Sequence, residues 1–230
     1  VFSSTELRQA LASVARDAAE VPDTGLFTAA SGLIPEGLTV DGIDYRTAAG
    51  DPLPMISDAK GLYRVARQGT QNSDFNQVTL LLPSGSGLTQ AAEQINGEWQ
   101  KQFSLFFSVE EVAPDEFAKR LAEGSYTIAL APISAESGSV YSILNQFTAA
   151  GGGLADYENS LYATQLAASA TATGSTRCSL LAECEKQLLQ DCAAVPLFAQ
   201  QKRLLVASGI KNLIFDPFGP VLDLTYTTKE

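Results

Sequence analysis

The most informative absence in this sequence is histidine, which does not occur at all. A Ser-His-Asp triad, a Cys-His pair, a histidine zinc site and an imidazole general base each need that side chain. Acid–base chemistry would therefore have to come from carboxylate, Lys, Tyr, Ser or Cys groups. The absence excludes most of the common hydrolytic and metal-dependent mechanisms.

Basic residues are also scarce. The chain has 15 Lys and Arg against 26 Asp and Glu, a net charge of −11 with a pI near 4.5. This is the wrong sign for binding nucleic acid or an anionic lipid surface, so we exclude both as primary partners. No apolar run approaches the ~18 to 20 residues of a membrane span. Val1 opens directly into a helix signal, so we expect any leader or lipid anchor to lie outside this sequence.

Only three cysteines are present, Cys178, Cys184 and Cys192, and their spacings of 6 and 8 match no zinc or redox motif. If Cys184 and Cys192 share one helix, they lie about 12 Å apart along its axis, beyond the ~7 Å limit for a disulfide. We predict buried thiols that pack as small apolar groups, with a bridge involving Cys178 as the alternative.

The 230 residues are 45% apolar, enough for one large domain or two small ones. The first helix is predicted from the capping-box spacing of Ser3 and Glu6 and ends before Val21. Gly and Pro are frequent over residues 23–54, which indicates an extended loop excursion. Ser57 and Asp58 then open a short helix that runs to Ala66.

Residues 78–131 form the most regular part. The pattern predicts a buried strand over 78–82, a helix over 88–103, a strand over 105–112, a helix from Pro114 to Gly124 and a strand over 126–131. This is a βαβαβ unit, so the fold class is α/β with a mostly parallel core sheet flanked by helices. Trp99 lies on the apolar stripe of the helix predicted over 88–103, which favours core packing over ligand stacking.

The remainder is predicted to alternate helices and short strands. We expect helices over 141–147, 161–168 and 179–191, a loop over 169–177, and strands over 195–198, 203–207 and 221–226. In the helix over 179–191, Leu180, Cys184, Leu188 and Cys192 form one apolar row. Glu183, Glu185 and Lys186 are interpreted as surface charge.

Two motifs have ordinary structural interpretations. The turn Pro83–Gly87 lies between a strand and a helix, where phosphate loops occur, but it lacks the Gly-Lys-Ser/Thr ending of a P-loop and the third Gly of a dinucleotide motif. An ordinary strand-to-helix turn, capped by Ser86 or Gly87, is the favoured interpretation. Glu110 and Glu111 are adjacent on a strand, point to opposite faces and cannot act as a carboxylate pair.

The segment 131–139 follows the carboxyl end of a strand, where open α/β sheets place their ligands. Short polar residues with free backbone groups surround one carboxylate, Glu136. This arrangement fits either a cationic or amine-bearing ligand at Glu136 or a plain solvated loop.

Several strings, in the right order, resemble the C-terminal lobe of the family 5 extracellular solute-binding proteins, the oligopeptide and dipeptide receptors of ABC importers. The strings are Glu6–Leu11, Leu33–Pro35, Ala91–Ile95 with Trp99–Lys101, Gly124–Leu130, Asp156–Asn159 and Ala194–Phe198.

The resemblance implies a periplasmic-binding-protein-like type II lobe, with residues 1–230 as a single C-terminal lobe whose N-terminal counterpart lies outside this chain. It implies a binding protein without catalysis or cofactor, which closes on a peptide and delivers it to a membrane permease, outside the cell or in the periplasm, often as a lipoprotein.

In the family, Gly-Trp-x-Ala-Asp follows the third core strand; the Trp lines the cleft and the Asp pairs with the α-amino group of the ligand. Aligned without gaps, Ile133 takes the Trp position, Ser134 the variable one, Ala135 the Ala position and Glu136 the Asp position. The resemblance thus implies a ligand site at these four residues. The alternatives are sensing or scaffolding on the same fold, a non-peptide solute such as a metal chelate or a sugar, and an enzyme that uses carboxylate, Tyr or Lys.

Overall fold

A three-stranded parallel sheet organises the first half of the molecule. The computed structural model describes residues 2–23, 25–68, 75, 78–134, 138–201, 203–215 and 222–229. The strands are β4 (Thr79–Pro83), β5 (Ser108–Val112) and β6 (Ile128–Ala129), in the order β5-β4-β6. Leu81 of the central strand pairs with Glu110 on one side and Ala129 on the other. The predicted βαβαβ unit and the α/β class are confirmed.

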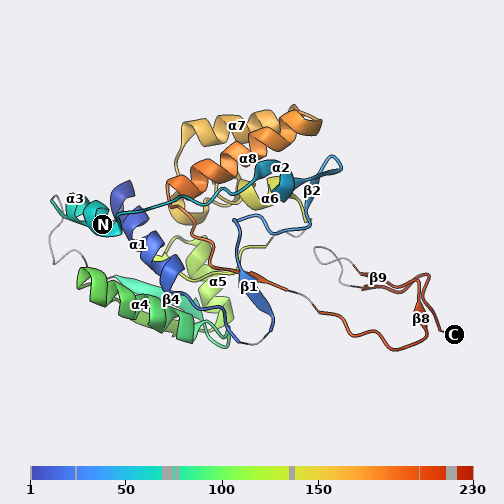
Figure 1. Ribbon diagram of the computed structural model, residues 1–230, viewed down its shortest axis with the longest axis horizontal. Coiled ribbons are helices and arrows are strands. Elements are labelled where there is room, and N and C mark those ends of the chain that lie inside the picture. The colour runs from blue at the N-terminus through green and yellow to red at the C-terminus, as the bar shows by residue number, and fades with distance from the viewer. Residues whose placement is uncertain are drawn as a thin grey trace.

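The crossovers of this unit are α4 (Thr89–Phe103) and α5 (Pro114–Ala122), which lie beside the sheet in Figure 1. Strand β5 is shorter than predicted, because the backbone of Phe107 bonds to a side chain. Asn96 donates to the Phe107 carbonyl at 2.5 Å and accepts from its N–H at 2.9 Å. Pairing with β4 therefore starts at Ser108.

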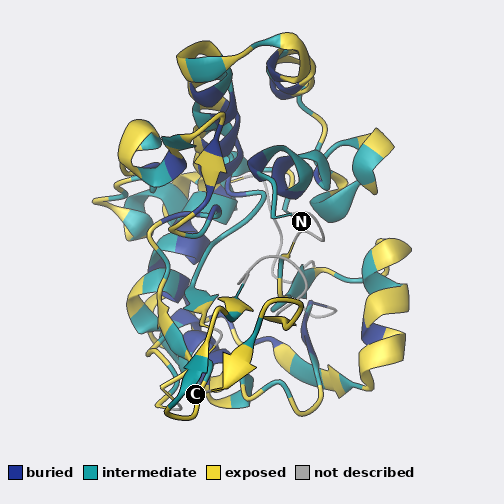
Figure 2. Ribbon diagram, turned by 90° about the vertical axis from the view of Figure 1, so that its right-hand side faces the viewer, coloured by how far each residue is buried: buried dark blue, intermediate teal, exposed yellow. Residues whose placement is uncertain are grey.

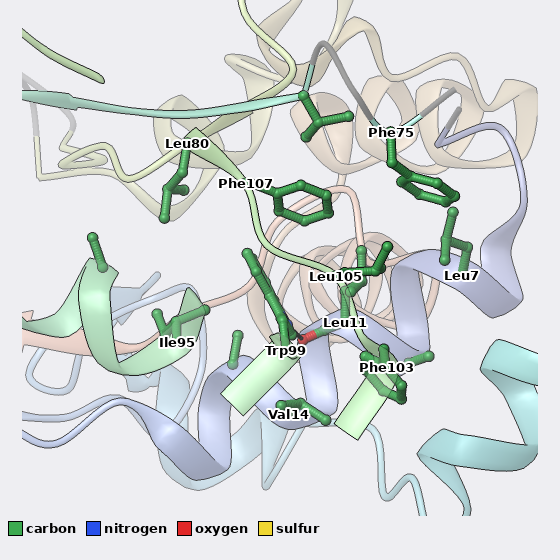
Figure 3. Packing of buried hydrophobic residues seen from close by; sticks show 14 of the residues in the cluster. Leu7, Leu11, Val14, Phe75, Leu80, Ile95, Trp99, Phe103, Leu105 and Phe107 are labelled. Carbon is green, nitrogen blue, oxygen red and sulfur yellow. Dashed lines mark hydrogen bonds between the residues drawn. The ribbon is translucent and has the colours of Figure 1, made fainter. Parts of the chain in front are cut away.

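The sheet core is an apolar cluster between the sheet, α4, α1 (Thr5–Ala18) and α3 (Ala59–Arg67). Trp99 lies in it and donates from its indole nitrogen to the Leu11 carbonyl at 3.0 Å, so the core-packing interpretation is confirmed (Figure 3). The cap of α1 is Ser4, whose hydroxyl accepts from the Leu7 N–H, so the predicted cap at Ser3 was wrong by one residue.

A second cluster, the helical core, lies among α2 (Tyr45–Ala49), α6 (Val140–Asn145), α7 (Ser160–Thr171) and α8 (Gly174–Gln190). The predicted loop over 169–177 was wrong. Ser169 is buried inside α7 because its hydroxyl donates to the Leu166 carbonyl at 2.7 Å, which satisfies the polar group within the helix. Two short 3-10 turns, Ala149–Gly151 and Leu154–Asp156, precede α7.

The buried row of α8 differs by one position from the prediction. Leu181, rather than Leu180, lies in the core with Cys184 and Leu188, and Cys192 follows the helix at a φ of 49°. All three cysteines are buried free thiols, so the predicted thiol state is confirmed and the bridge involving Cys178 is not formed. Glu185 was wrongly interpreted as surface charge, since none of its side chain is exposed.

The segment 23–54 is largely irregular, as predicted, but it also holds α2 and three short strands. Strand β1 (Phe27–Ala29) pairs antiparallel with β7 (Phe198–Gln200), and β2 (Thr39–Val40) pairs with β3 (Ile43–Asp44). Asp44 caps α2 by accepting from the Thr47 N–H at 2.8 Å. This cap places Tyr45 in the helical core.

After β7 the chain leaves the body as an arm, defined as the described residues 203–215 and 222–229, which reaches the C label in Figure 1. Two small antiparallel pairs form it: β8 (Ile210–Lys211) with β11 (Thr228–Lys229), and β9 (Ile214–Phe215) with β10 (Leu222–Asp223). The strand predicted over 203–207 does not form, and the one predicted over 221–226 is reduced to β10 within the described residues. Figure 2 shows this end of the molecule as largely exposed.

Candidate ligand site at the carboxyl ends of the strands

The carboxyl ends of β4, β5 and β6 meet at one edge of the sheet because the strands are parallel. The Ser84 N–H donates to the Val112 carbonyl at 2.8 Å, and the Leu130 N–H donates to the Leu81 carbonyl at 2.8 Å. These bonds extend the pairing by about one residue beyond each strand. Open α/β sheets place ligands at this edge.

Strand β6 is an edge strand of the described sheet, and no strand of the described residues pairs with its outer side. The Leu130 N–H points to β4, so the backbone groups of Ala129 point away from the sheet, and alternation in an extended chain would direct those of Ala131 and Ile133 the same way. Pro132 favours that extended geometry at Ala131. Among the described residues, no hydrogen bond is made by the N–H of Ala131 or Ile133.

Both ends of this segment are held by hydrogen bonds to residues beside the helical core. The Ala155 N–H donates to the Tyr126 hydroxyl at 3.1 Å, just before β6, and burial raises the pKa of that hydroxyl. Gln146, which follows α6, donates from its amide to the Ser134 carbonyl at 2.9 Å. The segment between these anchors is therefore fixed at two points while its outer backbone edge is open.

Two of the four site residues from the sequence analysis lie in the described part of the chain. Ile133 is half-buried and packs against the helical core, and Ser134 is exposed. Ala135 and Glu136 lie outside the described residues. The structure thus brings Ile133 and Ser134 to the edge of the sheet, while the role of the carboxylate stays a prediction.

The anchors Tyr126 and Gln146 were not identified from the sequence. Tyr126 carried a usable signal, because it is an aromatic residue with a polar tip at the entrance of a predicted strand. Gln146 carried none, since a single Gln after a short helix is common on surfaces.

The Pro83–Gly87 turn has the geometry of a strand-to-helix connection. Gly85 and Gly87 have φ values of 72° and 75°, where glycine is favoured. Leu88, not Ser86 or Gly87, is the cap of α4, and it has no side-chain cap bond. The Ser86 hydroxyl instead accepts from the Leu88 N–H at 3.3 Å.

The charges near this edge are engaged in local pairs. Glu110 is 2.7 Å from the guanidinium of Arg120, and Glu111 accepts from the Thr89 hydroxyl at 2.8 Å. Within the described ranges, no group of three or more Cys, Asp or Glu side chains is arranged to hold a metal ion. None of the described helices is long and apolar enough to cross a lipid bilayer.

Comparison with known proteins gives matches in structure only. No protein-family model matches the sequence, and no curated protein matches it. Solved structures do match over nearly the whole chain. The peptide-binding pheromone receptor PrgZ matches with a TM-score of 0.77 at 21% identity, over 99% of this chain and 45% of that one.

Two further solved structures give the same result. OppA of Listeria monocytogenes, solved with peptide, matches with a TM-score of 0.73 at 22% identity, over 99% of this chain and 45% of that one. The substrate-binding domain of the oligopeptide ABC transporter of Bacillus anthracis str. Ames matches with a TM-score of 0.74 at 17% identity. The match covers 98% of this chain and 46% of that one. The chain spans a little under half the length of each of these proteins. The chain therefore has the fold of part of a periplasmic-binding-protein-like type II protein, the fold that these peptide-binding proteins share.

Proposed function

We propose that this chain is the peptide-binding lobe of the substrate-binding component of an ABC importer. In this role it captures oligopeptides or dipeptides outside the cell and delivers them to a membrane permease, without catalysing a reaction. The observation that carries the proposal is the open outer edge of β6, where the N–H groups of Ala131 and Ile133 have no partner among the described residues. The likeness in fold to proteins described as peptide-binding supports it.

A peptide added along this edge would exchange main-chain hydrogen bonds with Ala129, Ala131 and Ile133. Backbone bonds are independent of side-chain identity, so such an edge accepts varied sequences. The anchors at Tyr126 and Ser134 fix the edge before the ligand arrives, which lowers the ordering cost of binding.

The polar end of the ligand is assigned to the four residues after Pro132. By the family resemblance, Glu136 pairs with the α-amino group, while Ile133, Ser134 and Ala135 line the path to it. In a closed two-lobe receptor, removal of a buried charge partner such as Glu136 should cost about 2 to 5 kcal/mol of binding free energy.

Residues 1–230 are proposed to be the C-terminal lobe of a two-lobe receptor. Two observations support this organisation: the solved structures are about twice as long, and the arm exposes large apolar side chains. Leu205, Leu224 and Tyr226 are 99%, 61% and 69% exposed. A two-stranded ribbon is marginally stable by itself, so a second lobe that covers the arm would stabilise it.

The two-lobe proposal can be tested on the arm. Replacement of Leu205 and Leu224 by Ser should leave the unfolding free energy of this chain within about 0.5 kcal/mol, because neither side chain is packed. In a protein that also carries the second lobe, the same change should lower stability. If the replacement has the same small effect on stability in the two-lobe protein as in this chain, the proposed cover of the arm by a second lobe is contradicted.

Cell-surface or periplasmic location and a lipid anchor are further parts of the proposal, taken from the resemblance. They are tested by fractionation of the producing cells and by mass determination of the mature protein. Small molecules that co-purify with the complete receptor, identified by mass spectrometry, would name the solute.

Peptide binding is tested by NMR titration of this chain with trialanine. We expect weak binding, because one lobe provides only half of the contacts, with shifts concentrated at Ala129, Ala131 and Ile133. Ala131→Pro removes the outward N–H and should abolish these shifts. Ala131→Ser keeps the N–H and is the matched control.

The amine contact is tested in the same titration with N-acetylated trialanine and with Glu136→Gln. Each change should weaken binding. If both remove the same contact between the amine and Glu136, their losses in binding free energy should not add when the two changes are combined. Unchanged binding in Ala131→Pro would overturn the edge-strand proposal. Unchanged binding in Glu136→Gln would contradict only the proposed contact between Glu136 and the amine.

A further inference from the structure

Helix α3 carries a stripe of positive charge on an otherwise acidic protein. Its nine residues include Lys60, Arg64 and Arg67 and no acidic residue, while the chain as a whole has a net charge of −11. Spacings of four and three place these side chains on one helix face. Lys60 and Arg64 are exposed, and in the described part of the chain neither forms an ion pair.

A pocket with polar and aromatic walls lies beside this stripe. It has a volume of about 460 Å³ and lies between α3, the end of α4 and the chain that enters β5. Its walls include Tyr63, Phe75, Phe103 and Phe106. Tyr63 stacks on Phe103 with ring centroids 4.5 Å apart, and Phe106 is 65% exposed.

Arg67 joins the stripe to the pocket. Its guanidinium carbon lies 4.9 Å from the ring centre of Phe75 and 5.9 Å from that of Tyr63. Phe75 in turn stacks on the fully buried Phe107, in the sheet core shown in Figure 3. Cation–π contacts on rings backed by the core hold the charge at the rim of the pocket.

This surface is separate from the proposed peptide site. Val78, which precedes β4, and Ser108, which opens β5, line the pocket, so it lies at the amino ends of the strands. The proposed peptide edge follows their carboxyl ends. Binding at one of the two sites can therefore be confirmed or contradicted independently of binding at the other.

We propose that the α3 stripe and its pocket bind an acidic segment of a partner protein, with carboxylates along Lys60 and Arg64 and one aromatic side chain in the pocket. An exposed aromatic side chain such as Phe106, next to Arg side chains, is a typical anchor of protein interfaces. A net charge of −11 repels an extended anionic membrane, whereas a short acidic segment can be attracted by the local stripe. Such binding should weaken with added salt.

The probe for this surface is a fluorescein-labelled peptide of sequence EEFEE, followed by fluorescence anisotropy with the intact chain. Two control peptides, KKFKK and EEGEE, remove the acidic charge and the aromatic anchor, and both should bind more weakly. The variant Lys60→Glu with Arg64→Glu should reduce the affinity for EEFEE roughly tenfold or more. Phe106→Ser should reduce it as well.

The matched control is Lys119→Glu with Lys186→Glu, which makes the same change in net charge at two exposed sites elsewhere. It should change the affinity less than twofold, roughly the scale of a screened distant charge. The proposal is overturned if EEFEE does not bind, if KKFKK binds equally well, or if both charge variants lose affinity equally. Binding of phosphatidylserine vesicles through Lys60 and Arg64, without binding of EEFEE, would assign the stripe to a membrane and would also overturn it.

Discussion

The carboxylate of Glu185 lies 2.8 Å from the guanidinium of Arg46, and the two residues are 139 positions apart in the chain. The Glu185 side chain is fully buried and also accepts from the Ile34 N–H and the Tyr45 hydroxyl, each at 2.9 Å. Arg46 additionally donates to the Ile34 carbonyl at 2.6 Å. This charged centre ties α2 and the loop before it to α8, and it joins the irregular segment 23–54 to the helical core.

Replacement of Glu185 by Ala should lower the free energy of unfolding by about 3 to 5 kcal/mol, since it leaves the largely buried charge of Arg46 uncompensated. Urea denaturation measures the change. Glu183→Ala, on the exposed side of the same helix, is the control and should stay within about 0.5 kcal/mol. A similar small loss in Glu185→Ala would contradict the role of the buried pair.

Gly32→Ala should destabilise the protein by about 1 to 3 kcal/mol, the usual range for overpacking. A methyl group at Gly32 would lie 2.6 Å from an Arg46 guanidinium nitrogen and 2.7 Å from a Glu185 oxygen. Gly97→Ala, in α4, meets nothing within 4 Å and should instead stabilise by about 0.4 to 1 kcal/mol. Thermal unfolding of the two variants should give melting temperatures that move in opposite directions.

Asn96→Leu should destabilise the fold, because it leaves the buried N–H and C=O of Phe107 without partners. Each unsatisfied group costs about 1 to 3 kcal/mol. Gln100→Ala, one turn further along on an exposed position of α4, is the control. Hydrogen exchange gives a site-specific readout, since the Phe107 amide should lose protection in Asn96→Leu. Retained protection there would show that the bond is dispensable.

Stability should decrease at alkaline pH through the buried thiols. Burial raises the pKa of Cys184 to about 12 and that of Cys192 to about 11. The unfolded chain releases these protons near its ordinary value of about 8.5, so it binds fewer protons than the folded chain above that pH. The free energy of unfolding should therefore be constant below about pH 8 and fall from there toward pH 11 to 12.

Urea denaturation between pH 7 and 9 tests this dependence where tyrosines of the unfolded chain, with a pKa near 10, are still almost fully protonated. Cys184→Ala should reduce the slope. In the folded protein at pH 8, the three thiols should react slowly with Ellman's reagent and become reactive in urea. Rapid reaction of the folded protein would contradict their burial.

The sequence alone determined the elements whose signals are local. The stripe of Ala92, Ile95, Trp99 and Phe103 defines α4, and a run of apolar residues between turn residues defines β4. Their order determined the βαβαβ unit, because parallel strands joined by helices have few allowed arrangements. Ile133 and Ser134 were placed after the third strand by the same reasoning.

The tertiary structure decided every feature that depends on a partner far away in the chain. Glu185 has the sequence pattern of a surface residue, and only its contact with Arg46 makes its burial favourable. The open edge beyond β6 exists because β4 has β5 on its other side, and its anchors come from Tyr126 and Gln146. Periodicity reports which face of an element is apolar, whereas pairing, burial of charge and the exposure of an edge follow from which elements meet.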